Sequence, residues 1–442
     1  MMDQADFRRA VLEKFEEKEE LCRAYVDSNI EAHRKGNVTL RLTDKTGAPI
    51  AGKRIHVSQK SHDFKYGANL FLLDEFPDGE RNARYREVFS EYFNLATVPF
   101  YWAELEPVEG KPRFAADSPK IYRRPAPDLC LDYCREKGIS AKLHCLFYDK
   151  FIPDWLPKRD EAEMFRLYEK RFREIAERYG NGKLYEVEVS NELLDEYRWT
   201  TQSVLCNRRD TPLWAWKMAE RYFPNDTLVI NEAQQLPSLA VHDYRAPYFL
   251  FLESLMNGGA RIDKIGVQHH MFVGSHGPQE TELPKYLKLM DPENVIHGLQ
   301  ILSDFGKPLE ITEVTVPTFL GDEETQAELL RRLYEIWFAT PLMESVVYWN
   351  TADGTAYVSP SGTANENNVH GGLFRNDLSP KQSAQMLKHL FGEVWHTELD
   401  LETDADGRVS FRGFYGDYEA RVGKTAARFG LRKGNGSVAV QI

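Results

Sequence analysis

The sequence contains little cysteine and no long apolar run. Its five cysteines, Cys22, Cys130, Cys134, Cys145 and Cys206, are odd in number and lack the spacing of a zinc site. Cys130 and Cys134 lie four positions apart in a helical stretch, a spacing that favours reduced thiols over a disulfide. No run of 18 apolar residues is present, so the sequence predicts neither a membrane-spanning helix nor a membrane partner.

The chain also lacks an excess of basic residues and the glycine-rich loops that bind nucleotides. Its 56 Lys and Arg against 68 Asp and Glu give a net charge of -12, and no basic run favours nucleic acid as a partner. The patterns G-x-G-x-x-G, G-x-x-x-x-G-K-[ST] and G-x-S-x-G are absent. The N-terminus, MMDQADFRRAVLEKFEEKEE, has no apolar signal core, so the sequence as it stands predicts a cytoplasmic protein. A secreted protein whose signal had been removed would have the same sequence.

The length of the chain allows one large domain and a smaller module. A (β/α)8 barrel takes about 250 residues, or more with insertions, out of the 442 present. Residues 3 to 35 are predicted to be helical and to pack on the domain surface, rather than bind a partner, through a loose apolar stripe of Phe7, Val11, Phe15, Leu21 and Tyr25. We predict an N-terminal helix over 1–36, the first part of an accessory β-sandwich over 37–62, a barrel over 63–392 and the second part of the sandwich over 393–442.

The two strand-rich segments at the ends of the chain are each too small to form a stable sheet alone. Alternation in NVTLRLTDKTGAPIAGKRIHV and again in GRVSFRGFYGDYEARVG predicts short strands that pair across the two ends. Between them, eight apolar runs alternate with helical stretches such as EAEMFRLYEKRFREIAERYG, which predicts parallel βα units. The expected barrel strands are 64–71, 94–100, 139–147, 185–192, 227–232, 264–270, 308–314 and 345–350.

Functional side chains of such a barrel project from the C-terminal ends of its strands. That rule selects His144, Asn191, Glu192, Asn231, Glu232, His270, Glu313, Trp349 and Asn350. Two carboxylates among aromatic and amide side chains are what cleavage of a glycosidic bond needs, because one protonates the leaving oxygen and the other attacks or supports the sugar carbon. No metal or organic cofactor is expected, since two carboxylates suffice.

Six segments resemble glycoside hydrolase family 10, the xylanase family, over roughly residues 63 to 390. VSNE at 189–192 resembles the acid/base motif of that family, and ITEV at 311–314 is similar to its nucleophile motif. IDKIGVQHHMFVG at 262–274, LHCLF with the later PDWL, YWNTAD at 348–353 and GLFRNDLSPKQSA at 372–384 follow further segments in the same order.

The resemblance implies a retaining mechanism with Glu192 as acid/base and Glu313 as nucleophile. It further implies that Asn191 binds the sugar 2-hydroxyl, that His270 orients the nucleophile, that His144 binds the same sugar and that Trp349 forms the floor beneath it. Additional substrate-binding candidates are Tyr148, Asp149, Gln268, Trp102 and Tyr357. Glu192 should then have a raised pKa and Glu313 should stay ionised. Asn231 and Glu232 are assigned structural parts, and Glu188, Glu310 and Asp353 are interpreted as surface or supporting charges.

The sequence departs from the family pattern where the nonreducing-side sugars would bind. TVPFYWAELEP keeps Trp102 and Glu106 but lacks the Glu, Asn and Lys of the pattern, and Tyr148 and Asp149 replace a Trp and a His. The predicted activity is retaining hydrolysis of a β-linked oligosaccharide or polysaccharide, most simply β-1,4-xylan or xylo-oligosaccharides. A second hypothesis is the same mechanism, perhaps exo-acting, on a different glycan. A third is a carbohydrate-binding protein without catalysis.

Overall fold

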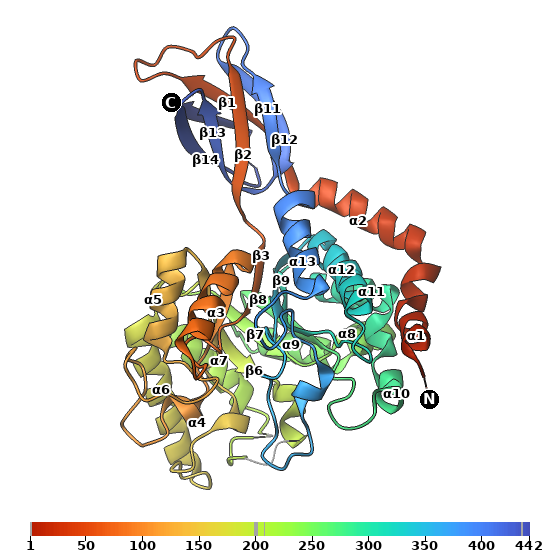
Figure 1. Ribbon diagram of the computed structural model, residues 1–442. Helices are drawn as coiled ribbons and strands as arrows, with labels where there is room; N and C mark the ends of the chain where they lie inside the picture. The colour runs from red at the N-terminus through yellow and green to blue at the C-terminus, as the bar shows by residue number, and fades with distance from the viewer. Residues whose placement is uncertain (1, 199–201, 207, 435) are drawn as a thin grey trace.

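The computed structural model describes residues 2–198, 202–206, 208–434 and 436–442. It has two lobes, a large barrel surrounded by helices and a smaller β-module that stands at one end of it (Figure 1). Two helices near the N-terminus run along the outside of the barrel and lead into the module.

Eight parallel strands close the barrel in the order β10-β3-β4-β5-β6-β7-β8-β9. They are β3 (Lys65–Asn69), β4 (Leu95–Pro99), β5 (Ser140–His144), β6 (Glu186–Asn191), β7 (Leu228–Glu232), β8 (Lys264–His270), β9 (Leu309–Thr315) and β10 (Met343–Tyr348). Each lies within, or within two residues of, an expected apolar run, so the predicted (β/α)8 fold is confirmed.

The connections between strands are mainly helical and pack around the barrel. They are α3 (Gly79–Tyr92), α4 (Trp102–Leu105), α5 (Pro127–Lys137), α6 (Glu161–Tyr179), α7 (Thr211–Tyr222), α8 (Leu236–His242), α9 (Pro247–Asn257), α10 (Gln279–Glu282), α11 (Pro292–Ser303) and α12 (Glu323–Ala339), followed after β10 by α13 (Gln382–His389). Helix α6 begins where the Asp160 carboxylate accepts a hydrogen bond from the Glu163 amide at 3.2 Å. It buries Leu167, Phe172 and Ile175, which recur at helical spacing and hold it against the barrel.

The N-terminal stretch forms two helices, α1 (Gln4–Glu17) and α2 (Glu19–His33), rather than one. Lys18 lies between them, and its ammonium pairs with Asp291 and Glu293, both at 2.7 Å. Because α1 and α2 bend at this position, Leu21 is 49% exposed and does not share the buried face that begins at Phe7.

The β-module consists of two small sheets that share one apolar core. In the first sheet, β1 (Lys35–Thr43) lies between β12 (Arg408–Phe414) and β15 (Ser437–Gln441). In the second, β2 (Arg54–His62) lies between β11 (Glu398–Glu402) and β13 (Gly416–Val422), with β14 (Thr425–Leu431) at the edge. The central strand of each sheet comes from the N-terminal segment and its neighbours come from the C-terminal segment. The predicted sandwich built from both ends of the chain is therefore confirmed.

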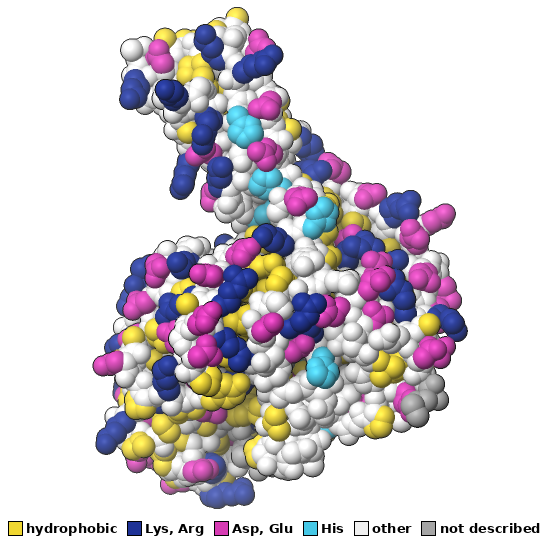
Figure 2. All heavy atoms as spheres, in the orientation of Figure 1, with side chains coloured by type: hydrophobic (Ala, Val, Ile, Leu, Met, Phe, Trp, Pro, Cys, Tyr) yellow, Lys and Arg dark blue, Asp and Glu magenta, His cyan; other side chains and the backbone are white. Residues whose placement is uncertain are grey.

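The module lies at the N-terminal ends of the barrel strands, opposite the end where their C-termini meet. A cavity of about 290 Å³ at the junction is lined from the barrel by Phe64, Pro308 and Met343 and from the module by Phe414 and Tyr415. Figure 2 shows a narrow neck between the two lobes. Among the described residues, no helix has the length and apolar character needed to span a membrane.

We expect Arg34→Met to destabilise the protein strongly, because the half-buried Arg34 guanidinium joins the end of α2 to the barrel. It donates hydrogen bonds to the carbonyls of Phe338, Thr340 (2.6 Å) and Met343 (2.7 Å). Losing the charge leaves buried carbonyls unpaired, at a cost of about 3 kcal/mol. Urea unfolding would measure this change, and the exposed Arg41→Met is the matched control with little effect. Equal midpoints for the two variants would contradict the assignment.

Candidate active site

The two glutamates selected from the sequence meet at the C-terminal end of the barrel. Glu192 directly follows β6, and Glu313 lies within β9. The pairing of β8 with β9 shifts register between Val267 and Gln268, so that Gln268 lies beside Glu313. Such an irregularity turns a side chain that strict alternation would aim elsewhere. It brings Glu313 and Gln268 together at the mouth of the barrel.

One amide group joins the two carboxylates. The Gln268 Nε2 donates to Glu192 Oε1 at 3.1 Å and to Glu313 Oε1 at 3.0 Å. It also lies 3.4 Å from the Asn191 side-chain oxygen. Gln268 was expected to bind substrate, and its amide lies at the centre of the site between the paired carboxylates.

Glu313 has two further polar partners. The Asn231 Nδ2 donates to Glu313 Oε1 at 2.8 Å, and the His270 Nε2 lies 3.1 Å from Glu313 Oε2. The Nδ1 of His270 lies 2.9 Å from the Thr315 hydroxyl, which fixes the plane of the ring. Burial lowers the pKa of His270 to about 4, so the imidazole is neutral at physiological pH. Asn231 was assigned only a structural part, and its direct contact with Glu313 places it within the site.

Glu192 has a different set of neighbours. The Tyr148 hydroxyl donates to Glu192 Oε2 at 2.5 Å, and the Lys150 ammonium lies 3.7 Å from the same oxygen. The backbone of Glu192 has a φ of 54°, in the left-handed region that a residue with a side chain rarely adopts. Glu232 supports this turn, because its carboxylate accepts hydrogen bonds from the amides of Leu193 and Leu194 at 2.8 and 3.2 Å. The structural part assigned to Glu232 agrees with this contact.

The pKa shifts of the pair run opposite to the expected ones. Burial opposes ionisation of Glu192, but Lys150, Tyr148 and Gln268 outweigh it, and the pKa of Glu192 lies below its ordinary value. Burial holds the pKa of Glu313 well above its ordinary value, and the charge of Glu192 adds to this effect. Both directions are opposite to the expectation of a raised pKa for Glu192 and an ionised Glu313.

Ion pairs inside the barrel support the site from below. Lys142, at 0% exposure, lies 2.9 Å from Glu188 and 2.8 Å from Glu310, and Lys264 lies 3.2 Å from Glu310. Glu188 also contacts the Nδ1 of His144. Burial opposes a charged imidazole, but Glu188 raises the pKa of His144 above its ordinary value. Glu188 and Glu310 are thus fully buried supporting charges, not surface residues.

His144 connects this buried network to the mouth of the barrel. Its Nε2 lies 2.9 Å from the Tyr101 hydroxyl, and its ring packs edge-on against Trp349 with centroids 5.2 Å apart. Trp349 also lies beside His270, at 6.2 Å between ring centroids. The indole of Trp349 therefore contacts both histidines. Tyr101 was not among the sequence candidates, although it closely follows β4.

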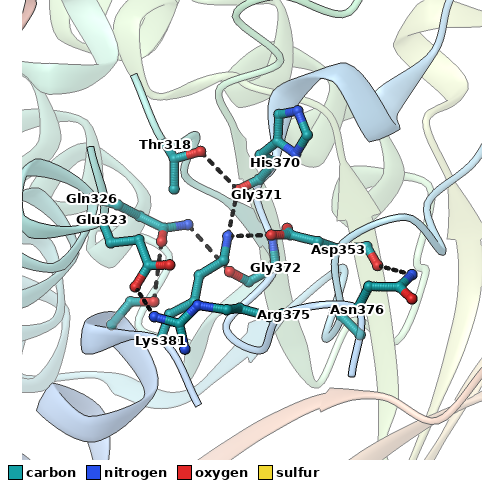
Figure 3. A network of polar contacts seen from close by, with 12 residues as sticks. Thr318, Glu323, Gln326, Asp353, His370, Gly371, Gly372, Arg375, Asn376 and Lys381 are labelled. Carbon is teal, nitrogen blue, oxygen red and sulfur yellow. Dashed lines mark hydrogen bonds and ion pairs between the residues drawn. The ribbon is translucent and has the colours of Figure 1, made fainter. Parts of the chain in front are cut away.

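The loop that follows Trp349 is held by a polar network on the outer side of the barrel. The buried Lys381 ammonium lies between the Asp353 carboxylate, at 2.6 Å, and the His370 carbonyl, at 2.8 Å (Figure 3). Asp353 also accepts a hydrogen bond from the Gly372 amide at 2.9 Å. Asp353 is accordingly a supporting charge. The same loop carries Tyr357, whose ring meets Phe151 beside Tyr148.

Two expected substrate-binding residues are turned away from the site. Asp149 is 0% exposed, and its carboxylate accepts hydrogen bonds from the Tyr168 hydroxyl at 3.0 Å and the Ser203 amide at 2.7 Å. Trp102 is 3% exposed, with its indole N–H bonded to Glu106 at 2.9 Å. Both follow barrel strands, as functional residues do, but their polar atoms are satisfied inside the protein. We therefore correct both assignments to structural roles.

Within the described ranges, no group of three or more His, Cys, Asp and Glu side chains is arranged to hold a metal ion. The arrangement is that of a barrel protein with a carboxylate pair at the C-terminal ends of its strands. Residues 76–390 match the profile of glycosyl hydrolase family 10, and the chain belongs to that family.

Known proteins similar to this chain include both enzymes and a regulator. Anti-sigma-I factor RsgI6 of Acetivibrio thermocellus is 24% identical over 92% of this chain, and endo-1,4-beta-xylanase 2 of Arabidopsis thaliana is 23% identical over 95%. The matched regions cover 48% and 36% of those proteins, so this chain spans less than half the length of either. Xylanase 10B from Thermotoga petrophila, solved with xylobiose, is similar in fold, with a TM-score of 0.59, 17% identity, and coverage of 75% of this chain and 95% of that one.

We expect Lys142→Met to destabilise the barrel by about 3 to 5 kcal/mol, since it leaves buried carboxylates without their cation. Denaturant unfolding would measure the loss. The difference in unfolding free energy between Lys142→Met and the unchanged protein should decrease as the pH falls. Protonation of the buried carboxyls then removes the charge that Lys142 no longer balances. Lys137→Met removes a lysine from an exposed ion pair with Glu136 and serves as the control with little effect. Wild-type stability in Lys142→Met would refute the supporting role of the network.

Proposed function

We propose that the protein hydrolyses β-glycosidic bonds with retention of configuration, with Glu192 as acid/base and Glu313 as nucleophile. The observation that carries this proposal is the shared Gln268 amide. Since one nitrogen lies within 3.1 Å of an oxygen of each glutamate, those oxygens are at most about 6 Å apart, which fits the separation of about 5–5.5 Å typical of retaining glycosidases.

The proposed reaction takes two displacements. In the first, Glu313 Oε attacks the anomeric carbon, the bond to the leaving oxygen breaks, and the Glu192 proton passes to that oxygen. In the second, Glu192 takes a proton from water, whose oxygen attacks the same carbon and releases Glu313. The two steps consume one water and return both carboxyls to their starting states.

The neighbours of the pair fit the binding of one sugar. The His270 ring beside Glu313 Oε2 orients the attacking oxygen, and Asn191 lies next to the Gln268 bridge, within reach of a sugar hydroxyl near the cleaved bond. The buried Trp349 ring, between His144 and His270, offers an apolar face on which a sugar can rest.

We propose β-1,4-xylan or xylo-oligosaccharides as the substrate. Family membership and the similarity to xylanases support this choice. The second candidate, the same chemistry on another glycan, is favoured by the rebuilt surroundings of Glu192. Tyr148 bonds directly to this carboxylate, and Lys150 adds a cation beside it.

Glu313→Ala should lose at least about 10³-fold in kcat with an aryl β-xyloside, because the covalent step then has no nucleophile. Added azide should partly restore turnover and give the α-glycosyl azide, since it attacks from the emptied side. Glu192→Ala is the matched variant and should give the β-glycosyl azide. Proton NMR of the products distinguishes the two. Exchanged anomers would reverse the two roles.

A panel of aryl β-glycosides that differ only in the sugar tests the substrate. We expect kcat/KM to be highest for the xyloside and for xylo-oligosaccharides. The sugars differ by small groups such as a hydroxymethyl, and a pocket that distinguishes a group of this size changes kcat/KM by about 10- to 200-fold. Activity confined to another sugar would replace xylan by that glycan.

A carbohydrate-binding protein without catalysis is the remaining alternative. Glu192→Gln and Glu313→Gln keep the size of each side chain and remove its charge. If the unchanged chain hydrolyses oligosaccharide while both folded variants only bind it, as followed by calorimetry, the binding-only hypothesis is excluded. Binding without hydrolysis by the unchanged chain would establish it.

A further inference from the structure

The hydrogen-bond donors and charges around the two carboxyl groups differ, so the two groups differ in how readily they hold a proton. Both oxygens of Glu192 face hydrogen-bond donors, Gln268 at Oε1 and Tyr148 at Oε2, and Lys150 places a positive charge beside Oε2. A carboxyl group in these surroundings is favoured as its anion, because each donor binds the charged form more strongly than the neutral one.

Glu313 instead has one oxygen that faces an imidazole nitrogen, which accepts or donates according to the tautomer of His270. Its Oε1 accepts from Asn231 and Gln268, while Oε2 lies 3.1 Å from the Nε2 of His270. A neutral imidazole has one nitrogen that donates and one that accepts. If the Nδ1 of His270 donates to the Thr315 hydroxyl at 2.9 Å, the Nε2 is free to accept a proton from Glu313.

We propose that in the site without substrate the proton of the carboxyl pair resides on Glu313, hydrogen-bonded to His270, and that Tyr148 and Lys150 are the positioning residues that keep Glu192 ionised. The proposal rests on the function proposed above. It means that the reaction begins with a redistribution of charge, in which Glu313 loses a proton to solvent and Glu192 gains one, so that the charge of the pair is unchanged.

The other ionisable groups around the pair are compatible with this arrangement. On the Glu192 side they are Tyr148 and Lys150 after β5, Glu232 at the end of β7 and His270 in β8. On the Glu313 side they are Tyr101 after β4, His144 in β5 and Glu188 in β6. Glu188 and Glu192 both favour the protonated form of Glu313, and His144, which opposes it, is itself paired with Glu188. The lowered pKa of Glu192 and the raised pKa of Glu313 agree in direction.

The pH profile of kcat/KM, which reports the free enzyme, tests the proposal. The productive state holds one proton in the pair. With the proton on Glu313, this state is lost at low pH when Glu192 is protonated and at high pH when Glu313 ionises. Tyr148→Phe and Lys150→Met each raise the pKa of Glu192. The acid limb should therefore move to higher pH by about one unit, the size expected for one lost contact with a charged group, while the basic limb stays in place.

The controls are Lys158→Met, in the same loop but paired with Asp154, and the exposed Tyr122→Phe, which should leave both limbs in place. A shift of the basic limb in Tyr148→Phe and Lys150→Met would place the proton on Glu192 and overturn the proposal. Unmoved limbs would overturn it as well. The Lys150 side chain is 39% exposed, so Lys150→Met is expected to disturb the packing less than Tyr148→Phe, and the acid limb is measured there if Tyr148→Phe misfolds.

A second measurement does not depend on turnover. In a Glu313→Gln chain labelled with carbon-13 at glutamate carboxyls, Glu192 should titrate below the ordinary value of about 4.3, and Tyr148→Phe in that chain should raise its midpoint. The Glu192 signal is identified by its absence in the Glu192→Gln, Glu313→Gln double variant. A midpoint at or above the ordinary value contradicts the proposal. Failure to hydrolyse any glycoside would defeat the proposed function but leave this titration as an independent result.

Discussion

The structure depends on the compensation of charge inside the barrel. The ammonium groups of Lys142 and Lys264 hold the carboxylates of Glu186, Glu188 and Glu310 in a space that barrels usually fill with branched aliphatic side chains. Buried carboxylates are tolerable only when they are paired with cations and hydrogen-bonded, so none of these groups can be removed singly without loss. Through Glu188 this network reaches His144, and through His144 it reaches Tyr101 and Trp349 near the C-terminal ends of the strands.

Much of the fold could be predicted because its signals are local and repeated. Each barrel strand is a short apolar run bounded by turns. The alternation of apolar and polar residues in 37–62 and 393–442 predicted strands too few to form a stable sheet in either segment by itself. The break at Lys18 escaped prediction because the partners of Lys18, Asp291 before α11 and Glu293 in its first turn, are far away in the sequence. The glutamates Glu192 and Glu313 were found because strand ends, motif and chemistry coincided at the same positions.

The errors have a common physical origin. The position of a residue along a strand does not determine which groups its side chain contacts in the folded protein. Asp149 follows β5 as a functional residue would, but Tyr168 and Ser203 satisfy its carboxylate inside the protein. Glu188 was assigned a surface or a supporting part, and its ion pair with Lys142 on the neighbouring strand β5 shows that it is a buried supporting charge. The protonation of the pair could not be inferred from the motifs either. In the proposed arrangement it is set by Tyr148 and Lys150, which the motifs do not single out as partners of Glu192.

The β-module meets the barrel at the end of the strands remote from the two glutamates. A carrier, a solid support or a neighbouring polypeptide attached to the module would therefore stand behind the barrel with respect to an approaching polymer. Such an attachment would lie at the opposite end of the barrel from Glu192 and Glu313 and would leave their end uncovered. Attachment through the β-module is therefore compatible with the approach of a polymer to the end of the barrel that holds Glu192 and Glu313.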